Sequence, residues 1–373
     1  MHLTPRFVVA ALLGSAFATV RVAAPAAAQA PLLEVEKSDA TKLLQVNDDA
    51  GFVVKGTLNT GRIPAVGPGV RLMWYPGKAA FRVGVGGPEW EDSNIGVGSV
   101  ALGEKTVASG ASSLAMGFDA AATSPHSTAI GYETRSSGTA STALGERTSA
   151  SGASSTAMGA RTTASGPAST AMGSQTKAVG VASTAMGRFT TALGDQSTAM
   201  GSNAAAATGG FAYGDGSTNA VITALPDQFA ARASGGFRFR TSANLSTGCD
   251  LPAGSGTFAC TSSRLAKEGF EDVDAEAALE KLADIPIQRW RYVDTRAEHI
   301  GPTSEDFHAA FGLGEGSRTI ATVDADGIAL LGVQALERRT ATLRDENAAL
   351  RAEVAALRAQ VEKVARGPAG GAE

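Results

Sequence analysis

The chain has 373 residues, of which 45 are glycine, 6% are aromatic and 18% are charged, and its formal net charge at pH 7 is −4. Because glycine and alanine bury little apolar area per residue, one chain of this composition makes only a thin core by itself. The weakly acidic balance provides no basic field for nucleic acid, so we expect no nucleic-acid partner.

The first 30 residues have the pattern of an export signal. Arg6 gives a weakly positive start, residues 7–20 are almost all apolar or small, and "AQA" at 28–30 fits a small-residue cleavage site. A membrane anchor is the alternative, but the apolar run is short and Arg21 interrupts it. We expect a signal peptide over 1–30 and an exported protein, at the cell surface or outside the cell. No later segment is apolar enough to span a bilayer.

Residues 31–90 have a different pattern. In "GVRLMWYPGKAAFRVG" (69–84), aromatic and β-branched residues are broken by Pro76-Gly77, which predicts a pair of strands. We expect a small β cap that protects the open end of the following segment. A ligand-binding tip is the alternative.

The next segment is a repeat. Glycine recurs every 14 residues from Gly103 to Gly201, each time after Ala and then Leu, Met or Ile. A second glycine series, from Gly110 to Gly194, lies seven residues out of phase, with Ser124 at its missing position. Two glycines in fourteen would ruin a helix or a coiled coil, whereas Thr-Ala-Met-Gly suits a short strand and a bend. The repeat predicts a parallel β-solenoid whose eight coils, about 4.8 Å apart, would extend roughly 40 Å.

One apolar side chain plus alanines per coil buries little area, so the solenoid should share its core with neighbouring chains. Residues 91–215 resemble the head repeats of YadA-like trimeric surface adhesins, which implies a left-handed parallel β-roll assembled as a homotrimer. The roll is expected to close at "FAYG" (211–214), which breaks the 14-residue spacing. The chain ends in "RGPAGGAE", without the strand pattern and terminal aromatic by which such adhesins anchor themselves, so we expect no transmembrane anchor of its own.

Residues 216–261 are predicted to be a β connector. Its Cys249 and Cys260 flank "DLPAGSGTFA", which is rich in turn-forming residues. Because export permits disulfides, we predict a hairpin closed by one bridge. Two free thiols are the alternative, and two ligands alone do not make a metal site.

The stretch after the connector resembles the endosialidase-type intramolecular chaperone, an auto-processing C-terminal domain of phage tail spikes and bacterial fibre proteins. The resemblance covers 262–336 and rests on Ser262 with Lys267-Glu268, "LADIPIQRWRY", "HIGPTSEDFHAAFG" and "VDADGIALLGVQAL". It implies that Ser262 attacks the Thr261–Ser262 bond and that Lys267 is the base. Two residues depart from the family: Ser263 replaces the usual Asp, and Gly269 replaces the usual Asn. A silent chaperone domain is the alternative.

Regular structure does not bring Ser262 and Lys267 together. Side chains five positions apart point about 140° away from each other on a helix and to opposite faces on a strand. A bend or a neighbouring chain is therefore needed. The lysine must also be neutral to accept a proton, which requires a pKa well below its usual value of about 10.4. Burial in an assembled interface would achieve this and would make cutting depend on assembly. His299 could orient the site, although a hydrogen-bonded core histidine is an equal alternative.

Around this site we expect a helix over 275–282 and a strand near Trp290. "DADG" at 324–327 lacks the glutamate of a calcium loop and is predicted to be a turn. "GVGG" at 84–87 lacks the setting of a phosphate loop. We therefore expect neither a metal nor a cofactor.

Residues 333–365 are predicted to form a coiled coil, because apolar residues fill two seams of a heptad pattern. The buried Asn347 and the leucines favour a dimer for the coil alone, whereas the roll requires three chains, and we expect three. One seam holds Val333, Thr340, Asn347, Val354 and Val361, and the other holds Leu336, Leu343, Leu350, Leu357 and Val364.

The sequence therefore predicts an exported, trimeric, mainly β protein of the surface-fibre type, whose tail trimerises the chain and then cuts itself off in one self-directed turnover. The alternative is an adhesin that binds a host surface, matrix or glycan ligand and has a non-cleaving tail. The expected order is a signal peptide (1–30), a β cap (31–90), a β-roll (91–215), a β connector (216–261), an α+β chaperone domain (262–332), a coiled coil (333–365) and a disordered tail (366–373).

Overall fold

A computed structural model describes residues 8–13, 16–22, 33–36, 42–46, 52–314 and 316–366. The cleavage site expected after residue 30 and residues 367–373 of the expected disordered tail lie outside this range. The chain divides into two compact units, Met1–Thr261 and Ser262–Glu373. No helix in the described segments is long and apolar enough to cross a membrane.

The N-terminal unit begins with an antiparallel five-stranded sheet in sequential order. Its first two strands fall within the segment expected to be a signal peptide. The strands are β1 (Val8–Leu13), β2 (Ala16–Val22), β3 (Leu33–Glu36), β4 (Lys42–Val46) and β5 (Phe52–Val54).

A hairpin leads into the solenoid. Strands β6 (Gly69–Tyr75) and β7 (Ala80–Gly86) pair antiparallel around the turn η1 (Pro76–Lys78), as the sequence predicts for 69–84. Strand β7 then pairs in parallel with the first solenoid strand, so the hairpin forms one end of that sheet. Two short turns, η2 (Pro88–Trp90) and η3 (Asp92–Asn94), follow.

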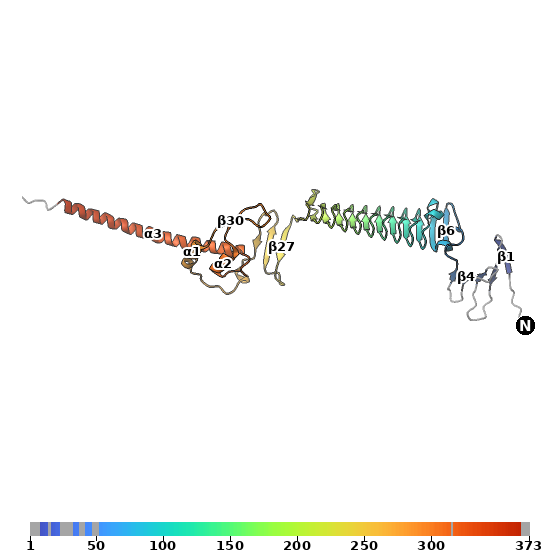
Figure 1. Ribbon diagram of the computed structural model, residues 1–373, viewed down its shortest axis with the longest axis horizontal. Coiled ribbons are helices and arrows are strands. Elements are labelled where there is room, and N and C mark those ends of the chain that lie inside the picture. Colours follow the sequence, from blue (N-terminus) through green and yellow to red (C-terminus); the bar gives the residue numbers. More distant parts are fainter. Residues whose placement is uncertain are drawn as a thin grey trace, which may run out of the picture. The chain divides into compact units, whose positions relative to one another are not determined.

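The predicted parallel β-solenoid is confirmed (Figure 1). Each coil contributes one longer strand to one sheet and one short strand to a second sheet. The longer strands are β8 (Val100–Glu104), β10 (Leu114–Phe118), β12 (Thr128–Tyr132), β14 (Thr142–Glu146), β16 (Thr156–Ala160), β18 (Thr170–Ser174), β20 (Thr184–Arg188), β22 (Thr198–Ser202), β24 (Phe211–Asp215) and β26 (Phe229–Arg232). The short strands are β9 (Val107–Ala108), β11 (Ala121–Ala122), β13 (Arg135–Ser136), β15 (Ser149–Ala150), β17 (Thr163–Ala164), β19 (Lys177–Ala178), β21 (Thr191–Ala192), β23 (Ala204–Ala206) and β25 (Ile222–Ala224).

The solenoid is longer than the repeat. Strands β25 and β26 pair in parallel with β23 and β24, so the stack continues past residue 215, where we expected it to close. Backbone pairing needs only an open strand edge, whereas the sequence signal needs glycine at each bend. In the last coil, Arg232 is in register with Gly214, so the glycine that marks the repeat in the sequence is absent there.

Alanine fills the inside of the solenoid. From β8 to β24, the second residue of each longer strand is a fully buried alanine, as at Ala157 and Ala171. The neighbouring Met158 and Met172 lie on the outer face, where they remain partly exposed. Alternation along a strand produces this separation, because successive side chains point to opposite faces. The large apolar side chains therefore do not fill the core of their own chain.

The outward residues form a continuous apolar ladder, with each member paired in register to the next. This ladder is an apolar surface that a neighbouring copy could share. It comprises Leu72, Val83, Leu102, Met116, Ile130, Leu144, Met158, Met172, Met186, Met200 and Tyr213.

Two large buried side chains tie residues 69–90 to the first coils. Arg82 is fully buried and donates to the Ser99 carbonyl (2.9 Å), the Ser99 hydroxyl (2.8 Å) and the Ala108 carbonyl (3.1 Å). Burial lowers the pKa of this guanidinium to about 10. Trp90 is also fully buried, and its indole N–H donates to the Thr106 carbonyl at 3.0 Å.

The N-terminal unit ends in a small antiparallel sheet of β27 (Gly236–Arg240), β28 (Gly248–Pro252) and β29 (Ala259–Cys260). In the register of this sheet, Cys249 lies directly opposite Cys260. The two residues form a disulfide.

The C-terminal unit is mainly helical, and it packs the apolar side chains of Ile285, Phe307 and Ile328 together. The sequence expected a turn at "DADG" (324–327), but these residues lie in the first turns of a long helix. An acidic residue in the first turn, here Asp324, favours a helix start. The elements are η4 (Arg264–Ala266), α1 (Ala275–Asp284), β30 (Gln288–Trp290), β31 (His299–Gly301), α2 (Ser304–Phe311) and α3 (Thr322–Ala365).

Candidate active site

Ser262 and Lys267 meet at the start of the C-terminal unit. The ammonium nitrogen Nζ of Lys267 donates a hydrogen bond of 2.8 Å to Oγ of Ser262. The bend that regular structure cannot supply is the single turn of 3₁₀-helix η4, which lies between them. Both side chains are exposed to solvent in one chain. The structure thus brings the two predicted residues into hydrogen-bonding contact within a single chain.

Ser263 holds this turn in place. Its hydroxyl accepts a hydrogen bond from the Leu265 amide at 3.2 Å, as an N-cap residue does. Aspartate, the residue usual in the resembling family, is an equally good N-cap. The departure at Ser263 therefore keeps a capping side chain.

Gly269 follows the turn with φ +69°, which is the left-handed region. Glycine and asparagine are the residues that adopt this conformation most readily. Glycine in place of the usual asparagine therefore keeps the required backbone. The preference for the left-handed region that glycine and asparagine have in common is the sequence signal that this position carries.

Thr261, on the other side of the candidate bond, is held by the small sheet. Its amide donates to the Gly248 carbonyl at 2.9 Å, and its hydroxyl donates to the same oxygen at 3.1 Å. The preceding residue is Cys260, which is bonded to Cys249. The boundary between the two compact units falls at the peptide bond between Thr261 and Ser262.

His299 lies in β31, against Trp290 and Tyr292, with ring centroids 4.8 and 5.6 Å away. Among the described residues no hydrogen bond joins it to Ser262 or Lys267. His308, in α2, shares a hydrogen bond of 2.9 Å with the Leu313 carbonyl. The described part of the chain holds no cluster of three or more His, Cys, Asp or Glu side chains that could bind a metal.

The turn η4 and the segment that follows it carry exposed apolar side chains. Leu265 is 99% exposed, and Phe270 and Val273 are 59% and 64% exposed. The Arg264 guanidinium lies 4.7 Å from the centre of the Phe270 ring. Neighbouring exposed apolar side chains are typical of surfaces used in protein–protein contacts.

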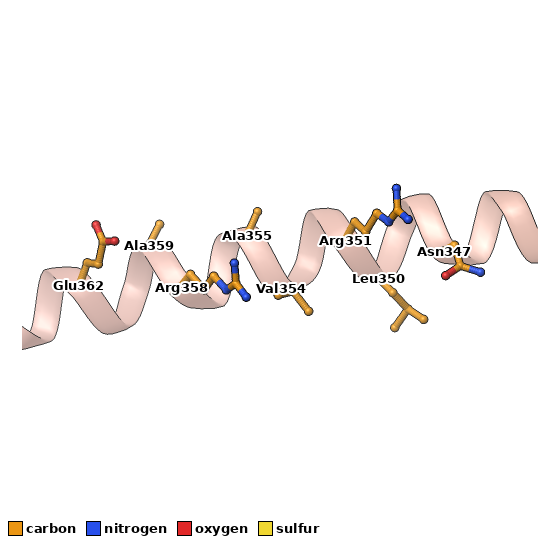
Figure 2. A pocket seen from close by; sticks show the side chains of 8 residues that line it. All are labelled: Asn347, Leu350, Arg351, Val354, Ala355, Arg358, Ala359 and Glu362. Carbon is orange, nitrogen blue, oxygen red and sulfur yellow. The ribbon is translucent and has the colours of Figure 1, made fainter.

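The long helix α3 presents the predicted coiled-coil seam to solvent. A shallow hollow runs along it between Asn347 and Glu362. Figure 2 shows Leu350 and Val354 projecting from one side of the helix, with Arg351 and Ala355 on the opposite side. Leu350 is 58% exposed and Val354 is 46% exposed, so no described residue covers this part of the seam.

Comparison with known families identifies both parts of the chain. The YadA head domain repeat matches five overlapping or adjacent stretches within 95–204, which are the solenoid coils. The chaperone of endosialidase, Peptidase_S74, matches residues 262–312, and the match begins at Ser262. The chain carries YadA head repeats and an endosialidase chaperone domain. A comparison with curated proteins finds no match.

Both resemblances that the sequence predicts are therefore confirmed. YadA-like heads are surface adhesins, and the two families together imply a trimeric assembly of the fibre or adhesin type. The apolar ladder of the solenoid and the open seam of α3 are the surfaces that such an assembly would bury.

Proposed function

We propose that the protein is an exported, trimeric, fibre-like surface protein whose C-terminal domain drives trimerisation and then releases itself by cutting the bond between Thr261 and Ser262. Export would remove residues 1–30. The observation that carries the proposal is the hydrogen bond of 2.8 Å between Lys267 and Ser262. The boundary of the compact units and the first residue of the chaperone match support the same bond.

The chemistry uses one nucleophile and one base. The Ser262 hydroxyl attacks the carbonyl carbon of Thr261 while neutral Lys267 takes the hydroxyl proton. The carbon–nitrogen bond breaks, the Ser262 amine leaves with a proton, and an ester joins Thr261 to Ser262 Oγ. Water then hydrolyses the ester, which leaves a C-terminal carboxylate on Thr261 and a free amine on Ser262. Each chain turns over once.

Assembly would supply the environment that this chemistry needs. A charged lysine donates its hydrogen bond to Ser262, and a neutral lysine is required to accept the proton. Burial disfavours the charged form of a lysine. Neighbouring chains that cover Leu265 and Phe270 would also remove water from Lys267, so that cutting follows trimerisation.

Incubating purified full-length protein without added protease tests the proposal. We expect fragments that separate between residues 261 and 262, with masses given by intact mass spectrometry. Ser262→Ala lacks the nucleophile and Lys267→Ala lacks the base, so both chains should stay intact. Ser263→Ala removes the adjacent hydroxyl and should still cut.

Cutting that persists in Ser262→Ala would indicate a contaminating protease. An intact wild-type trimer would instead favour the adhesin alternative, in which the tail only holds three chains together. A host-surface, matrix or glycan ligand of the head belongs to that alternative.

A further inference from the structure

We propose that the disulfide between Cys249 and Cys260 is a redox-controlled positioning device for the self-cleavage. It fixes the residue whose carbonyl Ser262 attacks, so that the chain cuts only after the bridge has formed. The inference rests on the proposed function and adds a condition that neither family match assigns.

The bridge lies one residue from the reacting carbonyl. Cys260 is bonded to Cys249, and Thr261 follows directly. The amide and the hydroxyl of Thr261 both donate hydrogen bonds to the carbonyl oxygen of Gly248, at 2.9 and 3.1 Å. Gly248 directly precedes Cys249, so the disulfide and the two hydrogen bonds fasten the same two backbone segments together.

Without the bridge few contacts would hold β29, which ends directly before Thr261. Strand β29 has two residues, both exposed, and its ladder consists of the pairs Cys249–Cys260 and Asp250–Ala259. The loop before it contains Gly254 and Gly256, which add conformational freedom. So short and exposed a strand frays readily. Reduction is therefore expected to release Thr261 from Gly248.

Release of Thr261 matters because the attack is intramolecular. Ser262 Oγ must reach the carbonyl carbon of its own preceding residue, and only part of the conformations of a free chain allow this approach. Fixing reacting groups in an attack geometry accelerates such steps, and a misplacement of about 1 Å costs about a hundredfold. A fastened Thr261 keeps the carbonyl in one orientation while Lys267 holds the hydroxyl.

Formation of the disulfide would also determine when the chain is cut. Two thiols become a disulfide by passing two electrons and two protons to a disulfide oxidant. Such oxidants act outside the cytoplasm. Inside the cytoplasm, thiols are kept reduced. A chain that requires the bridge stays whole until it has been exported, and the chaperone remains attached to the head until that point.

The test compares reduced and oxidised full-length protein. The chain is purified in dithiothreitol and transferred to oxidised or reduced glutathione, and the rate of cutting is followed by intact mass. We expect cutting at least about tenfold slower in the reduced protein, restored by reoxidation. Light scattering should give the same trimer in both states.

The pH dependence separates positioning from general damage. If the bridge only positions Thr261, the pH at which cutting is half-maximal should be the same in both states while the maximal rate differs. Cys249→Ser together with Cys260→Ser should behave like the reduced protein. Thr261→Val, which loses the hydroxyl bond to Gly248, should cut more slowly than Thr261→Ser, which keeps it.

Equal rates in the oxidised, reduced and double-serine proteins would overturn the positioning role and leave the self-cleavage intact. Assembly that fails on reduction would also overturn it, because the bridge would then be needed for folding. A shifted half-maximal pH would overturn it too, because the bridge would then act on the titrating group rather than on the position of Thr261. An oxidised wild-type protein that never cuts would overturn the proposed function, and this inference with it.

Discussion

Each glycine of the 14-residue series, from Gly103 to Gly201, lies against the carbonyl of the equivalent glycine in the next coil. At Gly159, φ is +117°, and a Cβ atom would lie 2.0 Å from the carbonyl oxygen of Gly173. That oxygen is backbone and cannot move away as a side chain could. Glycine therefore recurs every 14 residues because adjacent coils approach too closely there for a side chain, and not because the backbone has to be flexible.

We predict that Gly159→Ala destabilises the head by about 3 kcal/mol or more per chain, from backbone strain and steric overlap together. Thermal unfolding of the processed head measures this change. Gly256→Ala is the matched control, because a Cβ atom there meets nothing within 4 Å and should leave the melting temperature almost unchanged. A Gly159→Ala head with wild-type stability would contradict the close approach.

Asp215 fastens the last coil of the solenoid. Its carboxylate accepts from the Ser234 amide (2.5 Å), from the Ser217 hydroxyl (2.7 Å) and amide (3.1 Å), and from the Arg232 guanidinium (3.0 Å). The backbone bond from Ser234, followed by the two bonds from Ser217, holds the pKa of this carboxyl well below its usual value of 3.8. The charged form is thus favoured in the folded state.

A depressed folded-state pKa fixes the direction of the pH effect. Above about pH 4 the carboxyl is charged in both the folded and unfolded states, and its full stabilisation is present. As the pH falls further, the unfolded state takes up the proton first and the stabilisation is lost. We predict that Asp215→Asn lowers the melting temperature of the head at pH 7 and that the difference from wild type shrinks below pH 4. A constant difference down to pH 2 would show that Asp215 does not act through its charge.

At the residue scale, the sequence could identify Ser262 and Lys267 but not the contact between them. The hydrogen bond depends on the turn η4, which is stabilised by the Ser263 cap, and a local turn of three residues leaves no periodic signal. The contacts of Thr261 with Gly248 could not be predicted from the sequence either, because they depend on the register of a short sheet. Buried Arg82 was missed because its partners are backbone carbonyls and a serine hydroxyl.

At the scale of elements, α3 has two apolar faces with different partners. Its N-terminal part packs Ile328 within the C-terminal unit, and Gly332 lies against Leu282 of α1. The apolar side chains of the seam on the other face, from Val333 to Val364, are exposed in the single chain. The guanidinium of Arg339 forms an ion pair with the carboxylate of Glu276 on α1.

The charges beside the seam favour parallel chains. In a parallel coiled coil, Glu346 and Glu353 of one chain lie opposite Arg351 and Arg358 of the next, whereas antiparallel chains would bring like charges together. We predict that Glu346→Arg with Glu353→Arg lowers the melting temperature of the uncut trimer. Adding Arg351→Glu and Arg358→Glu should restore it. Circular dichroism in the Ser262→Ala background measures both effects, which salt should weaken.

A double variant as stable as the parent, or a quadruple variant that fails to recover, would count against these pairs. Each exposed pair contributes only about 0.2–1 kcal/mol, so the recovery rather than the loss is decisive.

The elements differ in how well the sequence foretold them. The 14-residue period is long and regular, and the solenoid that it predicts is present. The heptads lie in one long helix, and the coiled coil that they predict stays a prediction. The last coil, with β25 and β26, carries no repeat and was missed, and "DADG" was taken for a turn although α3 already begins at Thr322. Pairing with an existing edge and extension of an adjacent helix both override a weak local preference.

At the scale of the whole molecule, the apolar ladder creates a problem of register. Met158, Met172, Met186 and Met200 occupy equivalent positions in successive coils. A slip of one coil between neighbouring heads would still bring methionine against methionine. Contacts among these four methionines would not distinguish the slipped register from the correct one, whereas ladder positions that differ, such as Val83 and Tyr213, would.

A tail that trimerises first would solve this problem, because a short coiled coil with an asparagine in its seam has one preferred alignment. Once aligned, the heads need no further help, since each coil stacks on its neighbours and three ladders share one core. We therefore predict that deleting 262–373 from the gene gives misassembled or insoluble heads, whereas heads released from full-length protein remain trimeric. Light scattering of the two preparations, matched in sequence from residue 31 to 261, makes the comparison. Soluble, correctly sized trimers from the truncated gene would mean that the heads find their own register and that the tail has another purpose.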